Sequence, residues 1–118
     1  MAELTGKYIS QLRFRVGTIR AVKKHPKTSD YVLLVDIGHM GADRQMVADL
    51  KASYSLQQLL GRQVVFIENV SPIVVAGIES YGFILVAHKQ GKPILIEPGK
   101  KVSAGAEACL ISTVHVGH

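Results

Sequence analysis

The sequence predicts an all-β fold, a small five-stranded barrel with one short helix between the third and fourth strands. Segments of alternating apolar and polar residues recur along the chain, with turn-forming residues between them. One helix-start signal, Ser55 followed by Gln58, comes after the third such segment. The length of 118 residues suits one domain, so we expect a single unit over residues 1–118 with its core at about 12–111.

The first predicted strand covers residues 13–23 and ends at a polar turn over residues 25–30. Its inward apolar positions change parity at Gly17. These positions are Phe14, Val16, Ile19 and Ala21. A glycine at a parity change indicates a β-bulge, which lets one long strand serve both sides of a barrel.

Two strands, a short helix and two more strands follow. The predicted strands are residues 31–37, 44–50, 63–70 and 81–87. Ser55 and Gln58 have the spacing of a capping box, and Gly61 suits a left-handed stop. Residues 71–77 are predicted to be a loop. This order is that of the five-stranded OB-fold barrel, whose helix plugs the barrel between strands three and four.

Short extensions flank the predicted barrel. We expect a helical turn within residues 4–12 and short strands at residues 92–96 and 108–111. They carry apolar residues that the barrel does not need: Ile9, Leu12, Ile94, Ile96 and Ile111. Symmetric self-association is the commonest way to cover such residues. We therefore expect a two-fold homodimer whose interface is formed by the N- and C-terminal extensions.

Composition indicates an intracellular protein with a preference for polyanions. Fourteen Lys and Arg against nine Asp and Glu give a net charge of +5. No apolar run approaches the roughly 20 residues that cross a bilayer, and the N-terminus lacks a signal-peptide pattern. Cys109 is the single cysteine and lies in an apolar segment, where a buried inert thiol is expected. We expect a cytoplasmic location without membrane insertion.

The sequence gives no support for an enzyme. It contains neither a Gly-x-Gly-x-x-Gly motif nor a phosphate-binding Gly-Lys-Ser/Thr loop. Its five histidines are scattered without metal-ligand spacing, and a Ser-His-Asp constellation, which meets only in the fold, has no positive support. We expect no catalytic residues, no cofactor and no metal.

Cationic residues gather around the predicted ligand groove. OB folds bind ligands on strands two and three and on the loops that join strands one to two and four to five. Three lysines lie in or beside the first of these loops: Lys23, Lys24 and Lys27. Arg44 begins the third predicted strand and can bind phosphate in bidentate fashion. Two alternatives stay open. In the first, the lysines only prevent an edge strand from pairing with another chain. In the second, Arg44 pairs with an aspartate, Asp36 or Asp43.

Other residues near this groove have structural interpretations. His25 precedes a turn proline and is expected to make local hydrogen bonds. Tyr31 and Tyr54 are expected to pack in the core or at its rim. The aliphatic residues 73–75 are expected to complete the core. If they are exposed instead, they suit an apolar peptide or a dimer contact.

Several motifs occur in a fixed order along most of the chain. They include Val16-Gly17-Thr18-Ile19, Lys24-His25-Pro26, Val35-Asp36-Ile37-Gly38, Arg44-Gln45-Met46-Val47 and Gly77-Ile78-Glu79-Ser80-Tyr81-Gly82-Phe83. In these motifs the sequence resembles the tRNA-binding domain found as free-standing homodimers and at the C-terminus of many methionyl-tRNA synthetases. The resemblance implies a non-catalytic OB fold that recognises the outer corner of tRNA by shape. Its implied partners are tRNA, a second copy of the chain and a methionyl-tRNA synthetase.

The resemblance also implies RNA contacts at three matched positions, Asn69, Ser80 and Phe83. Phe83 stands where the family often has methionine. The full set of candidate RNA-binding residues is therefore Lys23, Lys24, Lys27, Arg44, Asn69, Ser80 and Phe83.

The chain departs from the tRNA-binding pattern in three places. Val74-Val75-Ala76 replace commonly basic residues, the segment after Pro26 is one residue shorter, and Ala48-Asp49 replace a serine-glycine pair. Ala48 and Ala76-Gly77 resemble the sister branch of CsaA-type export chaperones. The alternative function is therefore a chaperone that binds unfolded or preprotein segments through an apolar groove. A third hypothesis is an interaction subunit that docks a synthetase.

Overall fold

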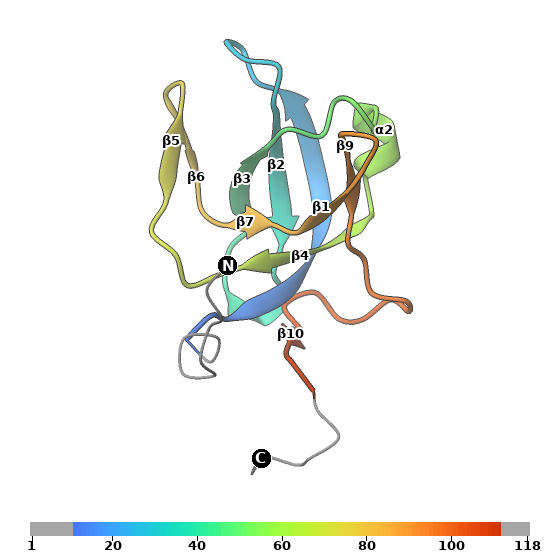
Figure 1. Ribbon diagram of the computed structural model, residues 1–118. Helices are drawn as coiled ribbons and strands as arrows, with labels where there is room; N and C mark the ends of the chain where they lie inside the picture. Colours follow the sequence, from blue (N-terminus) through green and yellow to red (C-terminus); the bar gives the residue numbers. More distant parts are fainter. Residues whose placement is uncertain (1–10, 112–118) are drawn as a thin grey trace, which may run out of the picture.

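The computed structural model describes residues 11–111. These residues form a nearly closed antiparallel barrel in which five strands follow the order β3-β2-β1-β4-β7 (Figure 1). The strands are β1 (Phe14–Lys24), β2 (Tyr31–Asp36), β3 (Arg44–Ala48), β4 (Gln63–Ile67) and β7 (Phe83–Ile84). A short 3-10 helix, η1 (Gly38–Met40), lies between β2 and β3. The predicted all-β barrel of the OB type is confirmed.

The long strand β1 serves both sides of the barrel, because it pairs with β4 along its first half and with β2 along its second. The β-bulge lies between Ile19 and Ala21, and the prediction of a bulge at Gly17 is wrong. Gly17 permits close packing, since a Cβ there would collide with the Val35 side chain. Beyond the bulge, Val22 packs against the core in the place expected for Ala21.

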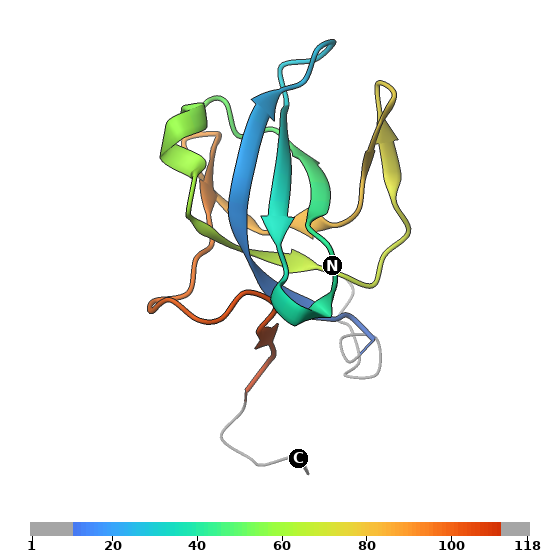
Figure 2. The same ribbon diagram turned by 180° about the vertical axis from the view of Figure 1, so that it is seen from behind.

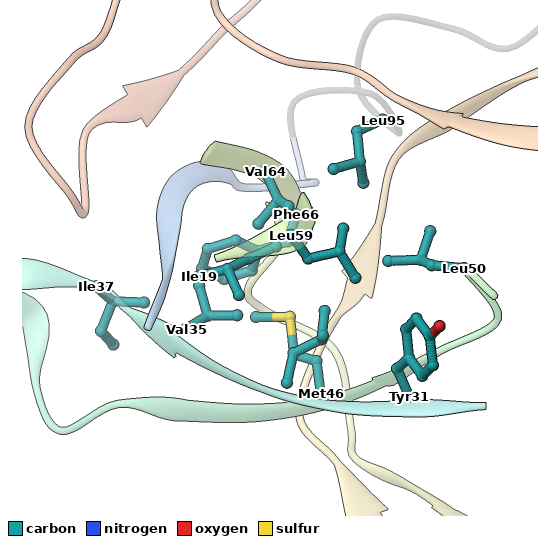
Figure 3. Close-up of a cluster of buried hydrophobic side chains, with 11 residues drawn as sticks. Ile19, Tyr31, Val35, Ile37, Met46, Leu50, Leu59, Val64, Phe66 and Leu95 are labelled. Atoms are coloured by element: carbon teal, nitrogen blue, oxygen red, sulfur yellow. The ribbon is translucent and has the colours of Figure 1, made fainter. Parts of the chain in front are cut away.

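The helix α2 (Leu56–Leu59) plugs the barrel between β3 and β4, as predicted. Both bonds of the capping box are present, because Ser55 Oγ accepts from the Gln58 N–H and the Gln58 side chain accepts from the Ser55 N–H. Leu59 is fully buried and joins a core that includes Ile19 and Phe66 (Figure 3). Burying a leucine of this kind contributes roughly 1.5–3 kcal/mol.

A β-hairpin occupies the segment that the sequence predicted as a loop. β5 (Ile73–Val75) pairs with β6 (Ile78–Ser80), and the hairpin projects from the barrel (Figures 1 and 2). The two turn residues, Ala76 and Gly77, have φ values of 45° and 88°, as a type I′ turn requires. Val74 is 66% exposed. The prediction that these aliphatic residues complete the core is therefore wrong, because the hairpin carries them outside the barrel.

The barrel closes between β3 and the chain at the end of β6, where Ser80 and Tyr81 lie. The Val47 N–H donates to Ser80 Oγ at 2.9 Å, and the Tyr81 N–H donates to the Gln45 carbonyl at 2.9 Å. Ser80 is 1% exposed, and its hydroxyl donates to the Gly82 carbonyl at 3.4 Å. At this junction the Ser80 hydroxyl, in place of a backbone carbonyl, is the hydrogen-bond acceptor for the Val47 N–H of β3.

The predicted strand over residues 81–87 is divided into two. β7 pairs with β4, and β8 (Val86–Lys89) turns away to form a hairpin with β9 (Lys92–Leu95). Tyr54 attaches this hairpin to the barrel, because its hydroxyl accepts from the Leu95 N–H at 3.0 Å and its carbonyl accepts from the Tyr31 hydroxyl at 2.8 Å. The expected core position of Tyr31, which is 4% exposed, is confirmed.

The chain ends differ from their predicted structure. β10 (Glu107–Ala108) pairs with the start of β1, so the predicted strand at residues 108–111 begins one residue earlier and stops at Ala108. Cys109 lies beyond it and is exposed, so its predicted burial is wrong. Most of the predicted helical turn at residues 4–12 lies outside the described residues. Within residues 11–111, no helix has the length and apolarity needed to cross a bilayer.

Candidate nucleic-acid interface

The turn between β1 and β2 presents three exposed lysines, Lys23, Lys24 and Lys27. Lys23 and Lys24 are the last residues of β1 and pair with Val32 and Tyr31 of β2. In the described part of the chain, no carboxylate lies within ion-pairing distance of the three lysines. Their charges are therefore available to an external anion.

His25 holds this turn in place and joins it to the β5–β6 hairpin. Its Nδ1 accepts from the N–H groups of Lys27 and Thr28, at 2.9 and 3.2 Å. The ring proton therefore lies on Nε2, which donates to the Val75 carbonyl at 2.8 Å. His25 is 4% exposed, and its expected role in local hydrogen bonding is confirmed. The two loops that flank the ligand groove of an OB fold are thus linked directly.

Arg44 lies at the far end of β3 from the lysines. It pairs with Val35 of β2, whereas Lys24 pairs with Tyr31, four residues away on the same strand. At about 3.3 Å per residue the separation along the strand is roughly 13 Å. The candidate cations therefore form two groups.

The partners of Arg44 differ from those considered in the sequence. Its Nη1 donates to the Glu68 carbonyl at 3.1 Å, and its guanidinium carbon lies 5.7 Å from the centroid of the Phe66 ring. Arg20 takes the two nearby aspartates instead, with distances of 2.9 Å to Asp36 and 2.8 Å to Asp43. Pairing of Arg44 with an aspartate is therefore wrong.

The three positions carried over from the resemblance have three different environments. Asn69 fastens the approach to β1, because its Oδ1 accepts from the Arg13 N–H at 2.8 Å and its Nδ2 donates to the Gln11 carbonyl at 2.6 Å. Ser80 is buried at the barrel closure and has no free surface to offer a ligand. Phe83 is 43% exposed. Of the three, Asn69 and Phe83 are exposed, and Phe83 makes the larger apolar contribution to the surface.

Phe83 lines a depression of about 300 Å³ between the end of β3 and the β8–β9 hairpin. Other residues that line it include Asp49, His88 and Pro93. The hairpin tip carries Lys89 directly opposite Lys92. The depression therefore lies between an aromatic ring and a second cationic turn.

Lys89 and Lys92 were not among the candidate residues predicted from the sequence. The two lysines flank Gln90 and Gly91, whose φ values of 52° and 78° form another two-residue turn. Gly91 of the Lys-Gln-Gly-Lys sequence is a turn signal between two apolar segments. Lys51, in the turn after β3, is also exposed and was not among the candidates.

A smaller depression, of about 170 Å³, lies on the outer face of β1, β2 and β3. Its lining is largely aliphatic, and it includes Val32 and Leu34, with Lys23 and Gln45 at its edge. Leu34 is 38% exposed. This surface has the chemistry of a small apolar groove with one cationic side.

The apolar residues expected at a dimer interface are exposed where the structure describes them. Leu12, Ile94, Ile96 and Ile111 are 38–92% exposed, and Ile9 lies outside the described residues. Ile94 lies in β9 and Ile96 follows that strand, whereas Leu12 precedes β1. The strand β9 lies beside α2 (Figure 1).

The described residues contain no cluster of three or more His, Cys, Asp or Glu side chains arranged to hold a metal ion. Three arginines are instead paired with carboxylates: Arg15 with Glu68, Arg20 with Asp36 and Asp43, and Arg62 with Glu97. Within residues 11–111 the lysines, together with Arg13 and Arg44, form no ion pair with a carboxylate.

Comparisons with known proteins identify the family. Residues 14–107 match the family described as "Putative tRNA binding domain". The chain is 43% identical over 97 residues to a methionine–tRNA ligase of Thermococcus onnurineus, which covers 81% of this chain and 13% of that protein. The chain spans 13% to 16% of the length of the curated methionine–tRNA ligases it matches.

Two solved structures share the fold at 25% sequence identity, and each covers 92% of this chain and 100% of the other. One is a MetRS-related protein from Pyrococcus horikoshii, with a TM-score of 0.82. The other is the chaperone CsaA from Bacillus anthracis, with a TM-score of 0.83. The chain belongs to the tRNA-binding domain family.

Proposed function

We propose that this chain binds tRNA through the lysine-bearing turns of the barrel. The observation that carries the proposal is the β1–β2 turn, on which three lysines without carboxylate partners stand on a backbone fixed by His25. Membership of the tRNA-binding domain family supports tRNA as the polyanion. The chain itself acts as a binding domain, with no catalytic step.

Phosphate binding by these lysines follows from simple electrostatics. A lysine that contacts a phosphate displaces condensed counterions, so binding weakens as salt rises. A lysine that already pairs with a carboxylate would first have to break that pair. Lys23, Lys24 and Lys27 have no such pair in the part of the chain the structure describes, and Lys89 and Lys92 add charge at the second turn.

We assign the remaining candidates to two roles. Phe83 offers an exposed ring on which a base or ribose can stack. Ser80 and Asn69 have structural roles, because Ser80 bonds across the barrel closure and Asn69 holds the approach to β1. In this proposal the homodimer, formed through the exposed residues of the extensions, presents two such surfaces to tRNA in the cytoplasm. A methionyl-tRNA synthetase is the proposed protein partner.

Two adjacent lysine pairs in the chain allow a matched test. Lys23→Glu with Lys24→Glu alters the proposed surface, whereas Lys100→Glu with Lys101→Glu makes the same change in net charge on an exposed loop elsewhere. In a gel-shift titration with bulk tRNA, we expect the first pair to lower affinity more than about tenfold and to reduce the salt slope by about two. The second pair is expected to bind almost like the wild type.

Two results would contradict the proposal. The first is wild-type protein that forms no complex with tRNA at low salt. The second is an equal loss of affinity in both lysine pairs, because net charge alone would then account for binding. Circular dichroism of each variant checks that the barrel is intact.

A second function, a chaperone for unfolded segments, is favoured by a separate observation. The outer groove of about 170 Å³ is aliphatic, and Val74 of the neighbouring hairpin is 66% exposed. The CsaA structure shares the fold. Suppression of aggregation of an unfolded client, together with no preference for tRNA over a generic polyanion, would support this function over tRNA binding.

A further inference from the structure

A larger depression, of about 480 Å³, lies at the end of β3 opposite the lysine turn. It is bounded by the connection from β2 to β3, the segment after β4 and the start of the β7 segment. Residues that line the depression include Ile37, Met40, Arg44, Glu68 and Tyr81. Its size falls within the range of pockets that hold small ligands.

The charges around this pocket are largely balanced within the protein. Glu68 Oε1 accepts from Arg15 Nε at 3.1 Å, and Asp43 pairs with Arg20. Arg44 donates to the Glu68 backbone carbonyl. A phosphate would meet two carboxylates here, so the pocket suits a neutral ligand with a polar edge.

Tyr81 supplies an aromatic wall. Its side chain is 40% exposed, and its hydroxyl donates to the Glu79 carboxylate. This hydrogen bond raises the pKa of the Tyr81 phenol above its ordinary value of 10.0. The Tyr81 N–H is fixed to the Gln45 carbonyl at 2.9 Å. Tyr81 is therefore held at its backbone and at its hydroxyl. A side chain held in this way loses little further entropy when a flat ligand stacks on its ring.

Glu68 and Arg44 supply the polar edge. Within residues 11–111, Oε1 of Glu68 accepts one hydrogen bond, from Arg15, and Oε2 accepts none, so each oxygen keeps a lone pair for a further donor. Arg44 uses Nη1 for the Glu68 carbonyl and has further N–H groups to donate. The pocket thus places an acceptor and a donor beside an aromatic face and the apolar side chains of Ile37 and Met40.

We propose that this pocket binds one unpaired guanine base of the RNA, stacked on Tyr81. Guanine presents two adjacent donors, N1–H and the N2 amino group, to the Glu68 carboxylate, and its O6 accepts from Arg44. Adenine, cytosine and uracil lack that pair of adjacent donors. Unpaired RNA bases are commonly recognised by such stacking and edge contacts. The inference rests on the proposed function and adds a base contact to its phosphate contacts.

One RNA molecule can reach both sites. The lysine turn and Arg44 are separated by four residues of β2, or roughly 13 Å along the strand. Phosphates bound at the lysines would therefore hold a loop of the same RNA near the pocket. The two contacts differ in their dependence on salt, which makes them separable by experiment.

The test compares Tyr81→Ala with Tyr81→Phe in tRNA titrations at several salt concentrations. Tyr81→Ala is expected to lower affinity roughly 5- to 100-fold, the loss associated with one stacked base, with an unchanged salt slope. Tyr81→Phe keeps the ring and is expected to bind within about twofold of the wild type. Both variants keep the backbone bond to Gln45, and thermal unfolding checks that they fold.

The base preference is tested with GMP, AMP, CMP and UMP added to isotopically labelled protein. At equal concentration, GMP is expected to shift the NMR signals of Glu68 and Tyr81 more than the other three do. Equal shifts confined to the lysine turn would show phosphate binding only and would overturn the proposal. If wild-type protein binds tRNA and Tyr81→Ala binds it equally well, the base pocket is excluded while the proposed function stands. If the wild type does not bind tRNA, the result contradicts the proposed function itself, on which the base pocket rests.

Discussion

The β1–β2 turn and the β5–β6 hairpin meet at one hydrogen bond, yet their exposed surfaces have opposite chemistry. The turn exposes Lys23, Lys24 and Lys27, whereas the hairpin exposes Ile73 and Val74. His25 of the turn donates to the Val75 carbonyl of the hairpin at 2.8 Å. A cationic surface and an apolar surface therefore lie next to each other and are joined by this hydrogen bond.

This contrast separates the two functions considered for the family's branches. A polyanion needs the turn and gains little from the hairpin, because branched aliphatic side chains offer nothing to a phosphate. An unfolded apolar segment needs the hairpin and the groove beside it. Variants that change one region, or the bond between them, show which surface carries binding.

The largest effect is expected from breaking the link with His25→Ala. The substitution removes the bond to Val75 and leaves the part-buried N–H groups of Lys27 and Thr28 without their acceptor. At 0.5–1.5 kcal/mol for each of three hydrogen bonds, we expect a loss of about 2–4 kcal/mol in the free energy of unfolding. Urea denaturation measures it, and tRNA affinity should fall because the lysine turn loses its fixed shape.

His39→Ala is the control for this variant. His39 lies in η1 and is exposed, so removal of its ring should change stability by less than about 0.5 kcal/mol. If His25→Ala were as stable as His39→Ala, the bond between the turn and the hairpin would have no structural importance.

The next largest effect is expected from Ser80→Ala, at the base of the hairpin. The substitution leaves the Val47 N–H without the Oγ acceptor and should lower the free energy of unfolding by about 1–3 kcal/mol. Ser71→Ala, at an exposed serine, is the control. We expect folded Ser80→Ala to bind tRNA with nearly wild-type affinity. A large loss of affinity without a loss of stability would instead make Ser80 a direct RNA contact.

A smaller effect tests the chemistry of the hairpin. Val74→Lys gives the hairpin the charge that the turn already has, and its exposed position tolerates the change. We expect tRNA affinity to rise about two- to fivefold and the salt slope to steepen by roughly 0.7–0.9. Val102→Lys, at an exposed valine in another loop, is the control for charge. An unchanged affinity in Val74→Lys would show that tRNA does not approach the hairpin.

The smallest effect concerns titration at the base of the hairpin. The hydrogen bond from Tyr81 to Glu79, with burial and the negative charge of Glu79 as further causes, raises the Tyr81 pKa above 10.0. Its contribution to stability is therefore present below pH 10 and is lost as pH rises through the folded-state pKa. Glu79→Gln should bring the Tyr81 pKa down, which ultraviolet titration of tyrosinate detects. An identical titration curve would show that the pair does not form in solution.

Local patterns predicted the barrel well. The strands β1 to β3 and the capping box at Ser55 depend on residues close in sequence, and both are confirmed, although the bulge in β1 lies between Ile19 and Ala21. The β5–β6 hairpin was missed because Ile73, Val74 and Val75 have the composition of a core segment. Its turn also uses Ala76 at positive φ, where Asn or Gly is the usual signal.

The site was predicted less completely, because its geometry depends on contacts between distant residues. Lys23, Lys24 and Lys27 were identified from their position beside a polar turn. The burial of Ser80 depends on Val47, 33 residues away, and the separation of Arg44 from the lysines follows from strand register. No local pattern contains either fact. Lys89 and Lys92 flank a two-residue turn, and this local feature could have predicted their place on the surface.

The central claim, that tRNA binds on the lysine-bearing turns, is tested most directly by mapping bound tRNA on isotopically labelled protein by NMR. We predict that the largest changes in amide signals occur in residues 23–28 and 88–92, and that they weaken together as salt is raised. Changes confined to the loop around Lys100 and Lys101, or the absence of any change at low salt, would contradict the claim.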